Sequence, residues 1–333
     1  MPEPVRVGAD GVGGWAATIL DAARRSPRVE IVRCFDVSPE ATRQAAAQYA
    51  CEAADSYEDL LADGRVEAIV SNTPNFVHLE HGRLAAAAGK HFYVAKPITN
   101  SLAEAAQLIR ACRDAGVVLT VGHQTRRHSA FRHMKELIAS GAAGTILQAE
   151  ANFSHAGGMS LTADRWRADR EKCPACPLMQ LGVHCTDTLV YLLGPARHIT
   201  GLMKHQATPV DIDDVTAALF EFECGALGYV GSNYASPGIH TINVYGTQAN
   251  LLTERYQLTL HWADGRREQP ELPEVDVYRE EIEDFAGAIR EGRDPEVTGE
   301  AGMAALAIVE GAIVSAREER TVHAVQLLQA SGS

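Results

Sequence analysis

The sequence predicts an α/β protein of two domains: an N-terminal doubly wound parallel sheet, and a C-terminal α/β domain with a large, mostly antiparallel open sheet. Three observations support this prediction. Strand and helix patterns alternate over residues 1–123, a glycine-rich turn follows the first strand, and most strand patterns after residue 123 have no helix between them. With 333 residues, the chain is long enough for both domains to bury a core.

The first domain is predicted to span residues 1–123, because apolar runs of strand length alternate there with helical spacing. Helices between consecutive strands act as crossovers, so the strands should be parallel. Strands are expected at 5–10, 29–36, 68–71, 91–94 and 117–121, and helices at 15–25, 39–49, 76–88 and 102–115.

The second domain is predicted to span residues 124–333 and to carry substrate binding and oligomerisation. Turn residues such as Glu223-Cys224-Gly225 and Asp264-Gly265 separate strand patterns directly, which favours antiparallel pairing. Strands are expected at 146–153, 217–222, 226–232, 241–245 and 257–262, and helices at 129–140, 181–193, 277–291 and 300–317.

Composition excludes several classes of protein. Asp and Glu number 43 against 30 Lys and Arg, and the net charge of −13 repels phosphate backbones and anionic lipid, so neither nucleic acid nor membrane is an expected partner. No Sec signal pattern is present at the start, and Glu310 interrupts the longest apolar helical stretch. Seven cysteines, an odd number, fit reduced thiols. These features predict a cytoplasmic protein.

The turn after the first strand, Gly11-Val12-Gly13-Gly14-Trp15-Ala16, fits the pattern G-x-G-x-x-A. Gly11 permits a tight turn, Gly13 lets the backbone approach a pyrophosphate, and Ala16 allows the helix to pack closely. An acidic residue, Asp36, follows Ala16 by 20 residues, as in dinucleotide-binding domains. The combination predicts a nicotinamide dinucleotide site, and an ordinary glycine-rich turn is the alternative.

Asp36 also bears on the choice of cofactor. Its carboxylate would accept hydrogen bonds from the ribose hydroxyls and repel a 2′-phosphate, which favours NAD over NADP. Arg33 and Arg43 are close enough in sequence to leave NADP open.

Two further turns follow predicted parallel strands at their carboxyl ends, the edge at which ligands bind in open α/β sheets. One contains Thr73-Pro74-Asn75 and His78, and the other contains Lys96-Pro97. A lysine before proline at this edge indicates a site residue, and a solvated side chain is the alternative.

The predicted helix at 181–193 and the residue before it present three polar groups on one face: Gln180, His184 and Asp187 fall at i, i+4 and i+7. An imidazole titrates near neutral pH, so His184 could accept a proton from an alcohol, and Asp187 could orient or stabilise it. A histidine that only packs or makes hydrogen bonds is the alternative.

Other polar residues are expected at the substrate entrance. Gln124 to His128 follow the last strand of the first domain, and Asn152 to His155 end the first strand of the second. Arg165-Trp166-Arg167 offers an aromatic face with flanking donors, which suits a sugar or a carboxylated ring, although an ordinary surface loop is equally consistent. Tyr234 and His240 border a loop after a strand and are weaker candidates.

Cys173 and Cys176 form a single C-x-x-C. Structural zinc generally needs four ligands, and no second pair follows at finger spacing, although His155, His184 and Cys185 could contribute. No metal is predicted.

Taken together, the motifs resemble the Gfo/Idh/MocA oxidoreductases, a family that includes glucose-fructose oxidoreductase and inositol dehydrogenases. The resemblance extends from about Val5 to Val322. It implies a Rossmann domain, an α/β domain with a large open sheet, a nicotinamide cofactor, and sugar or cyclic polyol chemistry. It rests on G-x-G-x-x-A, T-P-N-x-x-H, G-K-H-F-Y-V-A-K-P, G-x-H-x-x-D at 182–187, and 278–285 with Gly299-Glu300.

The resemblance also implies roles for two residues. Lys96 matches the lysine of the family's E-K-P motif, which lies near the nicotinamide and the reacting oxygen, and His184 matches the usual proton acceptor. Two positions depart from the pattern: Ala95 replaces the glutamate before the lysine, and Gln180 replaces a frequent aspartate. Inositol dehydrogenases generally use that aspartate, so the departure argues against a close inositol-dehydrogenase assignment.

The predicted site therefore has three sets of residues. The catalytic set is Lys96, His184 and Asp187. The cofactor set is Gly11, Val12, Gly13, Gly14, Trp15, Asp36, Val37, Thr73, Pro74, Asn75, His78, Lys96, Pro97 and Gln124. The substrate set is Lys96, Arg126, Asn152, His155, Arg165, Trp166, Gln180, His184 and Tyr234.

These residues predict an NAD-dependent dehydrogenase or reductase that moves a hydride between nicotinamide and a secondary alcohol of a sugar, sugar derivative or cyclic polyol. A homo-oligomer, a dimer or tetramer through the C-terminal sheet, is expected. One alternative is an enzyme that retains NAD and cleaves glycosides by transient oxidation and elimination. The other is a catalytically silent protein that binds NAD and sugar.

Overall fold

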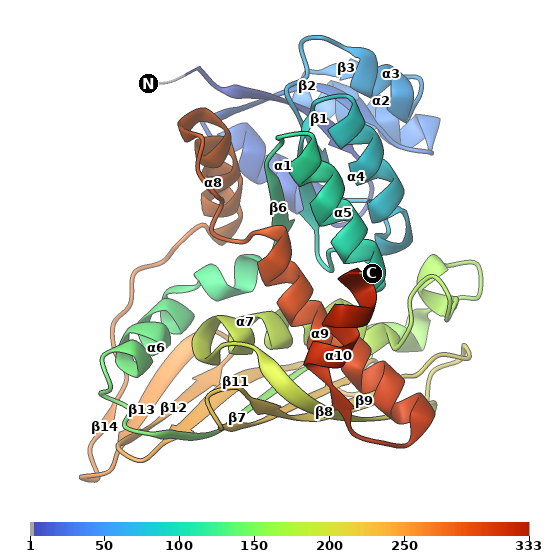
Figure 1. Cartoon of the computed structure of the whole chain (residues 1–333). Helices are drawn as coiled ribbons and strands as arrows, with labels where there is room; N and C mark the ends of the chain where they lie inside the picture. The colour runs from blue at the N-terminus through green and yellow to red at the C-terminus, as the bar shows by residue number, and fades with distance from the viewer. Residues whose placement is uncertain (1–2, 333) are drawn as a thin grey trace. The chain divides into compact units, whose positions relative to one another are not determined.

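The computed structural model describes residues 3–332, and the chain forms two compact units (Figure 1). The first unit contains the chain up to Thr99, Glu104–Gln124 and Asp276–Gly302. The second contains Asn100–Ala103, Thr125–Val275 and the chain from Met303 onward.

The first unit is built on a sheet of six parallel strands in the order β3-β2-β1-β4-β5-β6. This is the doubly wound order, so the predicted parallel sheet is confirmed. Its strands are β1 (Val5–Asp10), β2 (Val29–Phe35), β3 (Glu52–Ala53), β4 (Ala68–Ser71), β5 (His91–Ala95) and β6 (Leu119–Gly122).

The helices of this part of the chain are α1 (Ala16–Arg25), α2 (Pro39–Tyr49), α3 (Tyr57–Ala62), α4 (His78–Ala87) and α5 (Leu102–Asp114), with a short 3₁₀ turn, η1 (Asn75–Val77). Sequence determines where α2 begins. The Ser38 hydroxyl accepts a hydrogen bond from the Ala41 N–H, and Pro39 occupies the first turn. The sequence analysis did not identify β3 or α3, because elements this short show no periodicity.

The helix α8 (Val277–Glu291) belongs to the first unit, although the sequence analysis placed residues 277–291 in the second domain. Its apolar face explains the difference. Ile282, Phe285 and Ala286 are buried in the same core cluster as Val5 and Ile19, and α8 packs beside α1. The chain therefore returns to complete the Rossmann core after it has formed most of the second unit.

The second unit contains a sheet of nine strands in the order β14-β13-β12-β11-β7-β10-β9-β8-β15. Only β7 and β10 pair in parallel, so the prediction of a mostly antiparallel sheet is confirmed. The strands are β7 (Ile146–Ser154), β8 (Ala196–Lys204), β9 (Val215–Phe222), β10 (Leu227–Asn233), β11 (Ile239–Gly246), β12 (Ala249–Glu254), β13 (Gln257–Trp262), β14 (Arg267–Glu268) and β15 (Val322–His323).

Helices cover one face of this sheet, where Figure 1 shows α6, α7, α9 and α10. The helical segments are η2 (Gln124–Arg127), α6 (Ser129–Ala139), η3 (Ala156–Ser160), η4 (Trp166–Ala168), η5 (Leu178–Gly182), α7 (Val183–Leu193), α9 (Gly299–Glu318) and α10 (Ala324–Gly332). On the other face, β8 to β10 expose apolar side chains, namely Leu202, Val215, Leu219, Leu227 and Tyr229.

By length and composition, α9 could span a membrane in spite of Glu310; its most apolar window has a mean hydropathy of 1.4. In the structure, 61% of that window is buried. A Cβ on Gly201 of β8 would come within 2.1 Å of the Ala312 carbonyl oxygen, so strand and helix are in backbone contact. The Glu310 carboxylate accepts a hydrogen bond from the Leu102 N–H. The helix is thus packed as a core element.

Candidate active site

The turn between β1 and α1 has the geometry that its glycines predict. Gly11 has a φ of +73°, and a Cβ there would lie 2.9 Å from the Thr73 backbone nitrogen, so only glycine fits. Gly13 is open, because the nearest atom to its ideal Cβ is the Asp36 Oδ2 at 3.8 Å. No side chain caps the N-terminus of α1, and its first turn contains no acidic residue. This end of α1 therefore fits a pyrophosphate group.

The Asp36 carboxylate is held at the end of β2 by two backbone donors. Its Oδ2 accepts a hydrogen bond from the Val12 N–H at 2.9 Å, and its Oδ1 accepts one from the Ser38 N–H at 2.9 Å. The Asp36 N–H in turn donates to the Thr42 hydroxyl. These contacts fix the carboxylate beside the glycine-rich turn, where a ribose would be recognised. Val37, also in the predicted cofactor set, is 90% exposed.

Behind the glycine-rich turn, the end of β1 is anchored by the buried Asp10. Its Oδ2 accepts hydrogen bonds from the Ser71 hydroxyl at 2.8 Å and from the His81 Nδ1 at 2.7 Å. Burial lowers the pKa of His81, but the hydrogen bond to Asp10 and the Asp10 charge outweigh it, so the pKa lies above its usual value.

The two predicted ligand-binding turns of the sheet edge are joined by His78. Its Nδ1 lies 3.0 Å from the Pro97 carbonyl oxygen, and its Nε2 lies 3.0 Å from the Thr73 carbonyl oxygen. Burial lowers the pKa of His78, against the influence of these carbonyls. The ring is 1% exposed, so it fastens the turn after β4 to the turn that carries Lys96. Lys96 itself lies at the carboxyl end of β5 and is half-buried.

In the second unit, His184 lies in the first turn of α7, directly after a π-helical turn, η5. The expected α-helix at 181–193 therefore begins two residues later, and Gln180 lies in the π turn. Such turns are rare and occur often at functional sites. His184 is 6% exposed, and its Nδ1 shares a hydrogen bond with the Thr125 hydroxyl at 3.1 Å. Thr125 belongs to the segment 124–128 that was expected at the substrate entrance, but a contact with His184 was not predicted for it.

Asp187, predicted to orient His184, forms a buried two-point ion pair with Arg126. The Arg126 Nε donates to the Asp187 Oδ2 at 3.0 Å, and its Nη2 donates to Oδ1. The two side chains are 6% and 0% exposed. Arg126 was predicted to bind substrate, whereas here its charge is matched inside the protein. The contact that holds the Nδ1 of His184 comes from Thr125.

Aromatic and polar side chains surround His184 within the second unit. The Phe153 ring lies 5.8 Å from that of His184 and 6.3 Å from that of His155, which stacks on Tyr234. The His155 Nδ1 accepts a hydrogen bond from the Gly157 N–H, and burial lowers the pKa of His155. The Asn152 Oδ1 accepts a hydrogen bond from the Ser154 hydroxyl.

The loop before η5 brings Trp166 and Arg167 to Gln180. The Arg167 guanidinium lies over the Trp166 ring, 4.4 Å from its centroid, and the Arg167 Nε donates to the Gln180 Oε1 at 3.4 Å. Arg165 is exposed on the same loop. Two of the predicted substrate residues, Gln180 and Trp166, are thus connected in the structure, because Arg167 contacts both.

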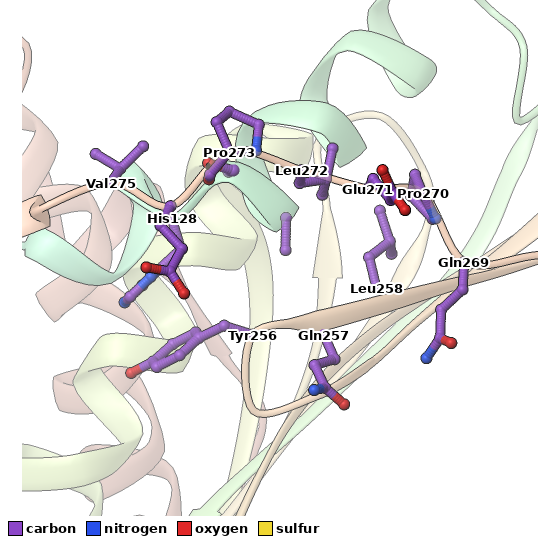
Figure 2. Close-up of a pocket in the computed structure, with 13 residues that line it drawn as sticks. His128, Tyr256, Gln257, Leu258, Gln269, Pro270, Glu271, Leu272, Pro273 and Val275 are labelled. Carbon is purple, nitrogen blue, oxygen red and sulfur yellow. Dashed lines mark hydrogen bonds between the residues drawn. The ribbon is translucent and has the colours of Figure 1, made fainter.

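A cavity of about 800 Å³ lies in the second unit between α6, β13 and the segment 269–275. Figure 2 shows its lining. The His128 ring stacks on Tyr256 with centroids 3.5 Å apart, and burial lowers the pKa of His128 to about 4. His128 comes from the segment expected at the substrate entrance, but no residue of the predicted catalytic, cofactor or substrate sets lines this cavity.

Cys173 and Cys176 are both buried beside the π turn. The neighbouring Cys176 thiol and burial raise the pKa of Cys173 well above its usual value. Over residues 3–332, no group of three or more His, Cys, Asp or Glu side chains has the arrangement of a metal site.

Comparison with known proteins gives two family matches. Residues 5–123 match the model of an oxidoreductase family with an NAD-binding Rossmann fold, and residues 131–252 match the GFO/IDH/MocA C-terminal domain. The chain is 28% identical over 322 residues to 1,5-anhydro-D-fructose reductase from Ensifer adhaerens, covering 91% of this chain and 93% of that protein. It is 27% identical over 334 residues to D-apiose dehydrogenase from Paraburkholderia graminis, with 94% and 88% covered.

Solved structures agree with the fold. A protein from Desulfitobacterium hafniense DCB-2, described as an NADPH-dependent oxidoreductase, superposes with a TM-score of 0.94 at 34% identity, covering 98% of this chain and 100% of that one. Levoglucosan dehydrogenase in complex with NADH superposes with a TM-score of 0.89 at 22% identity, with 96% and 99% covered.

Proposed function

Since this chain belongs to the Gfo/Idh/MocA family of oxidoreductases and carries its NAD-binding Rossmann domain, we propose that it oxidises or reduces a secondary alcohol of a sugar, sugar derivative or cyclic polyol. Relatives named as a reductase of 1,5-anhydro-D-fructose and a dehydrogenase of D-apiose support this substrate class.

The bound nicotinamide would supply the hydride acceptor or donor, and residues of the chain would bind the cofactor and transfer the proton. Gly11, Gly13 and the N-terminus of α1 would hold the pyrophosphate, and Asp36 would accept the ribose hydroxyls. Because a 2′-phosphate would meet the Asp36 carboxylate, NAD is the proposed cofactor.

The acid–base role falls to His184. Its Nδ1 shares a hydrogen bond with the Thr125 hydroxyl. In the tautomer that carries the proton on Nδ1, Nε2 would accept the alcohol proton as the hydride leaves the carbon. Lys96 would stabilise the negative charge that develops on the oxygen. The hydrogen bond between Thr125 and His184 is the single observation that carries this assignment, because it holds the imidazole ring through Nδ1 and leaves Nε2 as the nitrogen to face the substrate.

Reduction of free NAD, followed by absorbance at 340 nm across sugars, sugar acids, glycosides and inositols, tests the proposal. We expect stoichiometric NADH formation with at least one polyhydroxy substrate. Cleavage of a glycoside without net NADH would instead indicate transient oxidation and elimination. Tight NAD binding without turnover on any substrate would indicate a silent binding protein.

We also propose that the protein is cytoplasmic and forms a homo-oligomer through the face of the second sheet that exposes Leu219 and Tyr229. An antiparallel sheet commonly leaves one face to water, but that face is then polar. Here Leu219 of β9 is paired directly with Tyr229 of β10. The exposed surface at this pair consists of an aliphatic side chain and an aromatic ring. A second copy of the same surface, related by a two-fold axis, would cover them.

A further inference from the structure

A small pocket beside Trp166, which we call the arginine pocket, is positively charged. Its volume is about 310 Å³, and it is lined by Gly157, Ser160, Leu161, Arg165, Trp166 and Arg167. Both charged residues in this lining are arginines. In a protein with a net charge of −13, such a pocket is a local exception.

Neither arginine of this pocket forms an ion pair within the described part of the chain, although the Arg165 charge acts on the exposed Asp164 carboxylate. Two neighbouring arginines are matched: Arg126 pairs with Asp187, and Arg170 pairs with Asp211. By contrast, no carboxylate among the described residues comes within 4.0 Å of the Arg165 or Arg167 guanidinium. Arg165 therefore keeps its charge available, as does Arg167.

Arg167 is held in place before any ligand arrives. Its Nε donates to the Gln180 Oε1, and its planar group rests on the Trp166 ring. Gln180 is neutral, so it orients the guanidinium without cancelling its charge. Both Nη groups remain for a ligand, and a fixed guanidinium offers them as a fork that matches a carboxylate.

Two backbone N–H groups of the pocket are already bonded within the chain. The Gly157 N–H donates to the His155 ring, and the Leu161 N–H donates to the Gly158 carbonyl oxygen. A phosphate dianion is usually held by several backbone N–H groups together with cations. Two planar guanidinium groups suit a carboxylate better.

The arginine pocket is linked to His184 by two indirect routes within the second unit. On one side, Arg167 is bonded to Gln180, which lies four residues before His184. On the other, Gly157 is bonded to His155, whose ring contacts Phe153, and Phe153 contacts His184. We take the two places to be within reach of one ligand, with an anionic end at the arginines and an alcohol at the imidazole.

We infer that the substrate of this oxidoreductase is a polyhydroxy acid, such as an aldonic or uronic acid, whose carboxylate is bound by Arg165 and Arg167. The inference rests on the proposed function and narrows its substrate class. The carboxylate is unchanged by the reaction: the hydride leaves an alcohol carbon of the same molecule for nicotinamide, and the hydroxyl proton goes to His184.

Matched pairs of substrates test this inference on the full-length protein. Initial rates of NAD reduction would be compared for gluconate and glucitol, for galacturonate and galactose, and for glucose 6-phosphate and glucose. We expect kcat/KM for the better acid to exceed that of its neutral partner by about tenfold to a hundredfold, mainly through KM. Equal values within each pair, or a preference for the phosphate ester, would overturn the inference.

Variants of the pocket should remove the preference for acids. Arg167→Gln is expected to raise KM for the acids about tenfold or more, and Arg167→Lys to recover part of the loss because it restores charge without the fork. Gln180→Glu would place a carboxylate against Arg167 and should also raise KM for the acid substrates. Arg170→Gln is the matched control, because Arg170 is paired with Asp211 outside the pocket. An unchanged acid preference in Arg167→Gln would rule out this binding site.

A binding measurement separates this inference from the proposed function. Gluconate should change the fluorescence of Trp166, which lies under the Arg167 guanidinium, and the change should be absent in Trp166→Phe. If gluconate binds in this way but no alcohol is oxidised, the proposed function fails and the carboxylate site stands. If neutral sugars are oxidised and gluconate causes no change, the carboxylate site fails and the proposed function stands.

Discussion

At the scale of single residues, Asp36 should decide the choice of cofactor. Its carboxylate is held by the Val12 and Ser38 N–H groups, in the position where it would meet either two ribose hydroxyls or a phosphate. In Asp36→Ala, we expect NAD to bind more weakly and the ratio of NAD to NADP affinity to fall about tenfold or more, measured by calorimetric titration. Asp36→Asn keeps an acceptor oxygen without the charge, so its ratio of NAD to NADP affinity should lie between those of the wild type and Asp36→Ala. An unchanged ratio in Asp36→Ala would refute this role.

His184 should control the acid limb of the pH profile. An asparagine cannot accept a proton near neutral pH, so His184→Asn should lower kcat by about a hundredfold to ten-thousandfold while NAD binding persists. The wild-type kcat/KM for alcohol oxidation should fall at low pH as the imidazole becomes protonated, and this fall should be absent from the variant.

Thr125→Ser is the matched control for this experiment, because it keeps the hydroxyl that bonds to the His184 Nδ1. It should retain most of the activity and the same acid limb. A His184→Asn enzyme with a near-normal rate and an unchanged limb would show that the base lies elsewhere.

The motif and the helical spacing select His184 as a candidate, but they give no signal for the partners that the structure places beside it. Arg126 and Asp187 are 61 residues apart in the chain and belong to different segments, a loop and a helix. Periodicity within one helix placed Asp187 on the face of His184, whereas a long arginine from another segment occupies its carboxylate. Side-chain pairing of this kind depends on tertiary packing and has no local signal.

At the scale of secondary-structure elements, the pair of His81 and Asp10 ties α4 to the end of β1. Because the folded-state pKa of His81 is raised, the pair contributes its full stability below about pH 6.5, and the contribution is lost as the pH rises through the raised pKa. His81→Gln should therefore lower the thermal midpoint by several degrees at pH 6 and by less at pH 9. His133→Gln is the control, because His133 of α6 is partly exposed and pairs only with Glu136, whose side chain is 75% exposed. A loss of equal size at both pH values would contradict the expectation.

Long elements with clear periodicity were predicted well, and unusual ones were not. The predicted bounds of β1, α2, β4, β13 and α8 agree with the structure. The strand β8 was not predicted. It contains Gly201, which faces the backbone of α9 and adds no side chain to the alternating apolar pattern. The π turn before α7 also escaped prediction, because one inserted residue changes the hydrogen bonds without changing the apolar residues around it.

At the scale of the whole molecule, the apolar face of the second sheet should hold two copies together. We expect the wild-type protein to be a dimer or larger by sedimentation, and Leu219→Lys to dissociate it, because a charge would be buried opposite its own copy. Leu84→Lys, at an exposed leucine of α4, is the control. A monomeric wild type, or a Leu219→Lys variant with unchanged mass, would exclude this interface.

The return of α8 to the first unit has a consequence during synthesis. Ile282 and Phe285 complete a core that begins with Val5, so the nucleotide-binding half of the nascent chain cannot close until nearly the whole polypeptide has left the ribosome. A premature stop before Asp276 would leave that core open, with its apolar strands uncovered. For the same reason, no single cut in the gene would yield the nucleotide-binding half as a complete, independently folding fragment.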